Sequence, residues 1–451
     1  MRALLCILLA VAEATAVVFA QAAPRPATPV EPISAILDAF RTHVLVALAD
    51  EHGSEQGSAF RLNLIRDARF ASVVNDIVVE FGNARYQDLM DRFVRGETVR
   101  DEDLRHVWQD TTQVEYEWDL PIYEALFRTV RQVNASLPRE RQLRVLLGDP
   151  PIEWENVHTR DDLMRWLNIG RDAHAVTVIR REVLDKGHHA LLIYGGVHLL
   201  RKNAVIGAAD ERGVGLVAQL ERDGATSVFT VAPETRRDLN SIQPDVASWP
   251  TPSMAMLRGT LLGAANYSPS PQQRRVNMED QFDAILYLGP PASASISKLS
   301  AALCTQPGYL EMRLSRLSLV GPPDNAPISP ADSLKAFCAN PNGDVEIADN
   351  DPGVTDHVRQ VIREAAAGTV SESLIAPESR AQLIPRLEEI GKRYLAPAGE
   401  IRSITLLEDA PVLGGFRNRR YRTVFADGQK VVWSVRLSPA GEIVAMDPRP
   451  E

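Results

Sequence analysis

The sequence lacks long apolar runs, and it lacks the common catalytic motifs that would indicate a class of enzyme directly. Beyond residue 22 no stretch approaches the roughly 20 apolar residues of a membrane-spanning helix, so stable membrane insertion is not expected. There is no G-x-S-x-G elbow, no H-E-x-x-H helix, no phosphate-binding loop and no G-x-G-x-x-G after an apolar strand. These absences disfavour serine hydrolases, zinc proteases of that type and nucleotide-binding enzymes.

Basic residues are too few to form a broad positive surface. The chain has 49 Lys and Arg against 59 Asp and Glu, a formal net charge of −10. Nucleic acid and anionic membranes are therefore not expected partners. A hydrophobic fraction of 45% and a charged fraction of 24% are ordinary globular values, and 451 residues predict two domains.

Cysteine is also scarce, and one of the three cysteines, Cys6, lies in a predicted targeting segment. Residues 1–22 begin with a positive charge, continue as an apolar run and end in Ala-Gln-Ala, which predicts a signal peptide cleaved after Ala22. The protein is then periplasmic or secreted. In such an oxidising compartment Cys304 and Cys338 are expected to form a disulfide, the alternative being two buried thiols.

The rest of the chain predicts an α/β domain at 33–345, after an extended Pro-rich leader at 23–32. Short apolar strands that alternate with helices are typical of a mostly parallel sheet flanked by helices. Residues 240–277 lack periodicity and predict a loop, lid or insertion. The expected strands are 43–49, 76–81, 143–147, 189–194, 227–231 and 282–288, and the expected helices are 58–68, 84–95, 120–136, 161–186 and one from about 197.

A second, smaller unit is predicted at 354–451, after a boundary rich in Asn, Asp, Pro and Gly at 340–353. Two helices and then four strands with turn residues between them predict an α+β domain with an antiparallel sheet. The pattern resembles the nuclear-transport-factor-like accessory domains of some exported hydrolases. The expected helices are 355–367 and 378–394, and the expected strands are 401–407, 416–425, 430–437 and 443–447.

Four polar residues follow or close predicted strands: His52, Glu80, Asp149 and His198. Ligands of open parallel sheets bind in the crevice at the carboxyl ends of the strands, so these side chains are expected to share one crevice. A glutamate in an apolar strand needs a partner, because burying a lone carboxylate is unfavourable. Asp149 has an alternative interpretation, as the start of a turn before two prolines. The two glycines before His198, Gly195 and Gly196, indicate a tight turn or a close backbone approach.

The pair Arg171-Asp172 lies in the predicted helix 161–186. One interpretation is an exposed charged helix face. The other is an arginine directed at a buried carboxylate or a substrate anion, since the planar guanidinium binds such groups through two hydrogen bonds.

Together these segments resemble the erythromycin esterase/ChaN/Tiki superfamily, most closely its erythromycin-esterase-like branch. The likeness covers roughly 33–290 and extends more faintly to 345. Four segments show the likeness. Ala49-Asp50-Glu51-His52-Gly53-Ser54 is similar to the family's G-E-x-H-G-T opening, and Ile77-Val78-Val79-Glu80 is similar to its strand with a terminal glutamate. Arg171-Asp172 is similar to its R-D helix, and Gly195-Gly196-Val197-His198 to its G-x-x-H segment.

The resemblance implies one fold with several activities. The esterase branch hydrolyses a macrolide lactone with a histidine as general base, the Tiki branch contains metal-dependent proteases and the ChaN branch binds haem. Ala49-Asp50 stands where the motif has Gly-Glu, and the shorter Asp50 puts the positioning of the base in question. The implied catalytic residues are His52, Glu80, Arg171 and His198, and the implied substrate-binding residues are Asp50, Asp149, Asp172 and Gly196.

The residue types support the same chemistry independently. A histidine can take a proton from water, Glu80 can orient it, and Arg171 or His198 can stabilise an oxyanion. The set His52, Glu80 and His198 also has the chemistry of a divalent-metal site.

The leading hypothesis is an exported hydrolase of an ester, lactone or amide, acting on a small-molecule or peptide substrate, with no cofactor firmly implied. One alternative is a haem- or metal-binding protein, with His52 or His198 as axial ligand and Tyr194 or Tyr116 nearby. The others are a Tiki-like metal-dependent protease and a non-catalytic interaction module.

Overall fold

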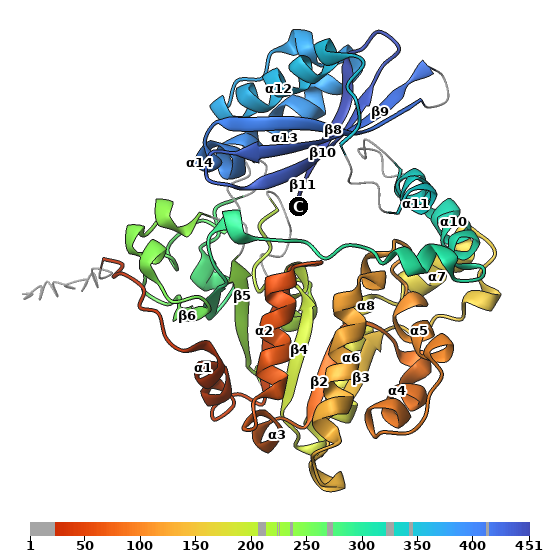
Figure 1. Cartoon of the computed structure of the whole chain (residues 1–451). Coiled ribbons are helices and arrows are strands. Elements are labelled where there is room, and N and C mark those ends of the chain that lie inside the picture. Colours follow the sequence, from red (N-terminus) through yellow and green to blue (C-terminus); the bar gives the residue numbers. More distant parts are fainter. Residues whose placement is uncertain are drawn as a thin grey trace, which may run out of the picture.

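The computed structural model describes residues 23–205, 213–222, 224, 226–234, 238–267, 274–321, 329–341, 346–411 and 415–451. The predicted signal peptide lies outside these residues. The described chain forms a seven-stranded, mostly parallel sheet flanked by helices and a separate four-stranded antiparallel sheet (Figure 1). The predicted fold class is thereby confirmed.

The large sheet has the strand order β3-β2-β4-β1-β5-β7-β6, and its strands pair in parallel except for β6 on β7. The central strand β1 is buried along its whole length, as expected of a strand covered on both faces. Strand order changes direction beside β1, which is where open α/β sheets form ligand crevices. The strands are β1 (Leu45–Asp50), β2 (Asp76–Asn83), β3 (Arg144–Asp149), β4 (Ala190–Gly195), β5 (Val228–Glu234), β6 (Ser253–Met256) and β7 (Ala284–Tyr287).

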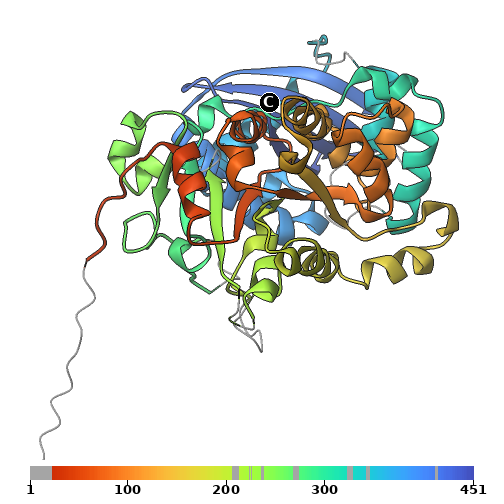
Figure 2. The same ribbon diagram turned by 90° about the horizontal axis from the view of Figure 1, so that it is seen from below.

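Two apolar cores lie on opposite faces of this sheet. Helices cover both faces, as the view from below shows (Figure 2). Val46 and Leu48 of β1 join one core, and Leu45 and Ala47 join the other, because successive side chains of a strand alternate. One face is covered by α1 (Pro32–Ala39), α2 (Glu55–Arg66), α3 (Phe70–Val73), α4 (Gln87–Val94), α5 (Asp101–Gln109) and α6 (Pro121–Asn134), and the other by α8 (Arg171–Glu182) and α9 (Leu216–Leu220). None of the helices in the described residues is long and apolar enough to cross a membrane.

The prediction of one helix over 161–186 is wrong. The structure has α7 (Arg160–Leu167), then α8, then the 3-10 turn η5 (Leu184–Lys186). Gly170 separates the two α-helices with a φ of +80°, a conformation that favours glycine. Arg171 therefore becomes the first residue of α8. The helix expected from about 197 is likewise only a 3-10 turn, η6 (Gly196–Leu199).

Residues 240–277, predicted to be a loop, lid or insertion, contain the edge strand β6, which the sequence reading missed. The Pro-rich leader lies against this edge, because Val30 exchanges two backbone hydrogen bonds with Met254. The strand β6 has only four residues and directly follows Pro252, so its apolar run is too short to predict a strand from the sequence. The 3-10 turns of this segment are η7 (Leu239–Ser241) and η8 (Pro244–Ser248).

The C-terminal domain has its own core, built around Tyr421, Trp433 and Val361. It lies over the end of the large sheet at which the parallel strands finish (Figure 1). The likeness to nuclear-transport-factor domains stays a prediction. The elements are α12 (Pro352–Ala367), α13 (Arg380–Ile390), the π-helix η14 (Gly391–Leu395), α14 (Ala396–Ala398), β8 (Ile401–Pro411), β9 (Arg417–Phe425), β10 (Lys430–Leu437) and β11 (Ile443–Pro450), with the strand order β11-β10-β9-β8.

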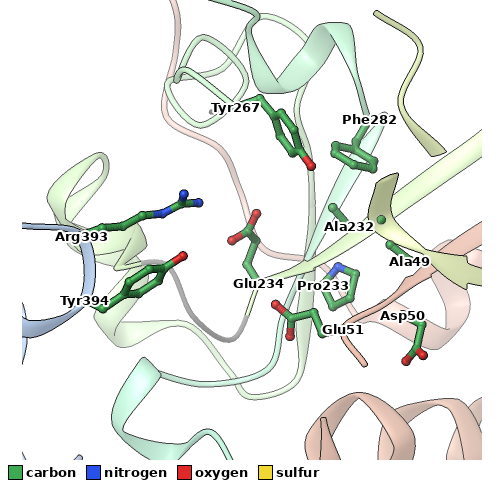
Figure 3. A pocket seen from close by; sticks show the side chains of 11 residues that line it. Ala49, Asp50, Glu51, Ala232, Pro233, Glu234, Tyr267, Phe282, Arg393 and Tyr394 are labelled. Carbon is green, nitrogen blue, oxygen red and sulfur yellow. The ribbon is translucent and has the colours of Figure 1, made fainter. Parts of the chain in front are cut away.

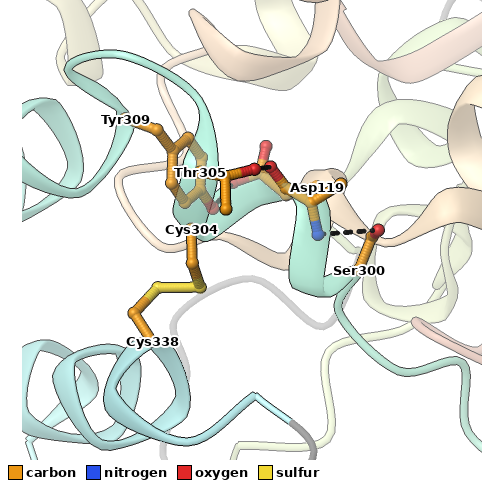
Figure 4. The surroundings of a disulfide bond; sticks show 7 residues. Asp119, Ser300, Cys304, Thr305, Tyr309 and Cys338 are labelled. Carbon is orange, nitrogen blue, oxygen red and sulfur yellow. Dashed lines mark hydrogen bonds between the residues drawn. A yellow bond between two sulfur atoms is a disulfide. The ribbon is translucent and has the colours of Figure 1, made fainter.

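The predicted disulfide between Cys304 and Cys338 is present (Figure 4). It joins the 3-10 turn η11 (Ala301–Thr305) to α11 (Pro330–Ala339). Between these elements runs α10 (Tyr309–Val320), whose Arg313 forms a buried ion pair with Asp119 at 2.6 Å. The bridge thus closes a helical segment that is already attached to the α/β domain.

Removing this bridge should destabilise the α/β domain. A Cys304→Ser/Cys338→Ser double variant frees a loop with a sequence separation of 34 residues, and roughly 2–4 kcal/mol of stability is expected to be lost. Thermal unfolding with and without reductant measures this. The wild-type protein in reductant should unfold at the midpoint of the variant, and equal midpoints without reductant would contradict the expectation.

Candidate active site

Asp50 closes β1 and holds His52 by a hydrogen bond of 2.9 Å between its Oδ2 and the imidazole Nδ1. The carboxylate is buried and has two further partners. Arg61 of α2 forms an ion pair with Oδ1, and the Tyr123 hydroxyl of α6 donates to Oδ2 at 3.0 Å. The carboxylate of Asp50 is therefore fixed from two helices before it reaches the histidine.

These contacts set the protonation of the pair. Burial opposes the charged form of Asp50, but the charge of Arg61 and the hydrogen bond with His52 hold its pKa well below the ordinary value. Burial alone would lower the pKa of His52, but the hydrogen bond and charge of Asp50, with the charge of Glu80, outweigh burial and raise it. Asp50 is consequently ionised at neutral pH, and His52 is a stronger base than a free histidine.

The far edge of the His52 imidazole lies over the end of β4. A Cβ atom added to Gly195 would come within 2.9 Å of His52 Nε2, so a side chain at this position would displace the imidazole. The Trp118 ring contacts the imidazole edge-on, with ring centroids 4.9 Å apart. The His52 side chain remains 32% exposed, which leaves it accessible to water.

Glu80, buried in β2, is the centre of a second polar group. Its Oε2 accepts a hydrogen bond of 2.7 Å from the Gly195 backbone N–H. Its Oε1 lies 3.1 Å from His198 Nε2 and 3.2 Å from Arg171 Nη2. The other nitrogen of His198, Nδ1, lies 2.6 Å from Asp172 Oδ1, so this imidazole bridges two carboxylates.

The partners of Glu80 and His198 shift both groups toward their charged forms. Burial would raise the pKa of Glu80, but the hydrogen bond and charge of His198, together with Arg171, lower it to about 2. Burial would lower the pKa of His198, but hydrogen bonds with Asp172 and Glu80 raise it to about 9. At neutral pH the structure therefore holds a cationic His198 beside an anionic Glu80.

Asp149, at the end of β3, belongs to the same group through Arg171, whose Nε lies 3.2 Å from Asp149 Oδ1. The backbone N–H and the hydroxyl of Thr112 each donate to its carboxylate at 2.6 Å. Burial nevertheless raises its pKa to about 6, against the opposing effect of Arg171. Asp149 thus fixes Arg171 and does not only begin a turn.

The expected site residues lie together, in two connected groups, with one difference in pairing. Glu80 was expected to orient His52, but Asp50 makes that contact, and the shorter aspartate reaches it without difficulty. Sequence reasoning missed Arg61 and Tyr123. Arg61 had a signal, as a charged residue on the apolar face of α2, whereas nothing in the pattern marked Tyr123.

The contacts of His198, Glu80 and Tyr194 do not suit a metal ion or haem. In the described part of the chain no cluster of three or more His, Cys, Asp or Glu side chains could hold a metal ion. Both nitrogens of His198 already contact carboxylates, and the Arg171 guanidinium lies beside Glu80, where a metal would have to bind. Buried Tyr194 packs its hydroxyl against Gly148, which leaves it no room for haem.

A cavity of about 240 Å³ opens beside this site (Figure 3). His52 and His198 follow within two residues of Glu51 and Gly196, which line its inner end. Two of the residues predicted to face substrate, Asp50 and Gly196, therefore border a cavity. The lining is Ala49, Asp50, Glu51, Gly196, Ala232, Pro233, Glu234, Tyr267, Phe282, Arg393 and Tyr394.

No model of a protein family matches the sequence, and no curated protein matches it. Among solved structures, a Bacillus cereus protein is similar with 11% identity and a TM-score of 0.40, over 61% of this chain and 97% of that one. A succinoglycan biosynthesis protein has 9% identity and a TM-score of 0.44, over 61% and 96%. A mutant erythromycin esterase in its open conformation has 12% identity and a TM-score of 0.41, over 59% and 94%. Similarity at this level carries no argument about activity.

Removing the charge of Glu80 should lower the pKa of His198. In Glu80→Gln the imidazole keeps Asp172 but loses the neighbouring anion, so its pKa is expected to fall clearly below about 9. NMR titration of the histidine ring signals measures this. His106 is the internal control, because its pKa is raised by Asp110, at 2.7 Å, and should not change. An unchanged pKa of His198 would show that Glu80 does not act on it.

Proposed function

We propose that this protein is an exported hydrolase that uses His52 to activate water against an ester, lactone or amide. The observation that carries the proposal is the His52–Asp50 pair, a partly exposed imidazole bonded to a buried, ionised carboxylate at the end of a central strand. The cavity beside the pair offers space for a substrate.

The reaction follows from the pair. Asp50 accepts the Nδ1–H of His52, which fixes the tautomer that leaves Nε2 free as the base. Nε2 takes a proton from water while the water oxygen attacks the carbonyl carbon, and Asp50 stabilises the imidazolium that forms. The imidazolium then protonates the leaving oxygen or nitrogen as the tetrahedral intermediate collapses. The products are a carboxylic acid and an alcohol or amine.

The second group supplies charge and rigidity. His198 and Arg171 are cations held beside Glu80, and in this proposal they stabilise the oxyanion of the tetrahedral intermediate. Glu80 bonds the Gly195 backbone N–H, which fixes the strand end over which His52 lies. In this proposal Glu80 positions the site, and His52 performs the proton transfer.

Export is part of the proposal. The predicted signal peptide at 1–22 would direct the chain to the periplasm or the medium. The disulfide between Cys304 and Cys338 supports this location, because such bridges persist in oxidising compartments.

Replacing His52 should abolish most turnover. In the mature chain, residues 23–451, His52→Ala is expected to lower kcat/KM for ester or lactone hydrolysis roughly 10²–10⁴-fold. His188→Ala is the matched control, since His188 forms a similar pair with Asp76, at 2.7 Å, at the opposite end of the sheet. Equal losses in the two variants, or turnover that survives His52→Ala, would exclude His52 as the base.

The pH profile should report the same pair. Because the base must be neutral and its pKa is raised above 6.5, kcat/KM is expected to fall as the pH drops through a value above 6.5. Asp50→Asn removes the charge that raises this pKa, so the acid limb should move to lower pH while the maximal rate decreases. An acid limb at the same pH in both proteins would contradict the assignment.

A further inference from the structure

The cavity beside His52 is completed by the C-terminal domain. Its inner end is formed by the end of β1 and by Gly196 of η6, whereas Arg393 and Tyr394 come from the π-helix η14 (Figure 3). Helices of this type are rare and occur frequently at functional sites. Two segments more than 300 residues apart in the sequence thus share one cavity.

The backbone of η14 is held firmly by its own domain. A Cβ atom at Gly391 would lie 1.8 Å from the carbonyl oxygen of Ala365 in α12, so glycine allows direct helix contact. Leu395 is buried in the domain core. Lys392 lies against Gly368 and does not line the cavity, unlike the two residues that follow it. The fold therefore directs Arg393 and Tyr394 toward the cavity.

A further contact joins the C-terminal domain to the α/β unit. Lys298 forms an ion pair of 3.7 Å with Glu451, which is also paired with Arg422 of β9. A second cavity, of about 400 Å³, is lined by Arg393 and Tyr394 together with Asp238, Pro290 and Gln429. Arg393 and Tyr394 thus line both cavities, and an extended substrate could contact them from either one.

The guanidinium of Arg393 is not neutralised by a carboxylate of the described residues. Among the described residues no carboxylate forms an ion pair with it, and its guanidinium lies 5.2 Å from the centre of the Tyr394 ring. Figure 3 shows both side chains projecting toward the cavity from the side opposite Asp50. A partly buried guanidinium in a concave site is suited to bind a carboxylate through two hydrogen bonds.

The cavity is lined by three carboxylates and one guanidinium. Asp50 and Glu51 lie at the inner end, near His52, and Arg393 lies at the outer wall. Glu234 also lines the cavity, and it takes part in polar interactions of its own, as Glu51 does. Among the described residues that line the cavity, Arg393 is the only cation, so a substrate with one anionic end would bind with that end at the outer wall.

We propose that Arg393 and Tyr394 determine specificity, by binding an anionic group at the end of the substrate remote from the bond that is cleaved. Arg393 binds the anion, and Tyr394 packs against the adjoining carbon chain. The identity of the cleaved bond rests on the proposed hydrolase function, but the anion-binding step does not depend on turnover. The substrate class is therefore an ester, lactone or amide that carries a carboxylate or a similar anion.

Two esters that differ only at the remote end test the specificity. Mono-4-nitrophenyl glutarate carries a carboxylate where 4-nitrophenyl pentanoate carries a methyl group. The wild-type kcat/KM should favour the glutarate ester, and Arg393→Ala should reduce this preference roughly 10- to 100-fold. Lys392→Ala, which removes the neighbouring cation outside the cavity, should keep the preference.

A binding experiment separates this inference from the hydrolase proposal. Calorimetry compares the 4-nitroanilides of glutaric and pentanoic acid on the wild-type protein, Arg393→Ala, Lys392→Ala and His52→Ala. The inference holds if the wild-type protein prefers the carboxylate probe and only Arg393→Ala loses the preference, even when no ester is hydrolysed. No preference in the wild-type protein, or one that Arg393→Ala retains, overturns it. Turnover that survives His52→Ala affects only the proposed base.

Discussion

A carboxylate buried at the end of a strand requires a cation or a set of hydrogen-bond donors beside it, and this requirement organises the α/β domain. The strands β1, β2 and β3 end in or near Asp50, Glu80 and Asp149, each almost completely buried. Their partners come from elements packed on the sheet, as Arg61 from α2 and Arg171 from α8. The same contacts that pack these helices on the sheet consequently also neutralise the buried carboxylates of the site.

The two polar groups meet at β4, which lies between β1 and β2 in the sheet. Gly195 contacts both, since its N–H donates to Glu80 while its missing side chain makes room for His52. Glu80 acts on His52 mainly through its charge, and Asp50 acts through a direct bond. Asp50 and Glu80 are similarly buried, but they contact His52 differently because different cations neutralise them.

The sequence predicted most of this arrangement because the strand ends are marked by pattern. Continuous apolar runs located the strands, and the polar residues after them located His52, Glu80, Asp149 and His198. The break at Gly170 was missed, since a single glycine does not interrupt helical periodicity strongly enough to be read as a helix end. Which acid holds His52 depends on distances of a few ångströms, and periodicity does not determine these.

Two parts of the site lay beyond sequence reasoning for a different reason. Tyr123 reaches Asp50 from 73 residues away, and Arg393 reaches the cavity from a separate domain. Such contacts depend on how complete elements and domains pack, which local patterns do not encode. The accessory domain itself was predicted, but its contribution to the wall of the cavity was not.

The position of Tyr394 in the chain also determines when the site is assembled. The whole large sheet, with Asp50, His52 and Glu80, precedes residue 300, and the outer wall of the cavity is synthesised only afterwards. A chain still being made would therefore contain the His52–Asp50 pair without Arg393 and Tyr394 of the outer wall. The order of synthesis thus delays the complete cavity until the C-terminal domain has folded.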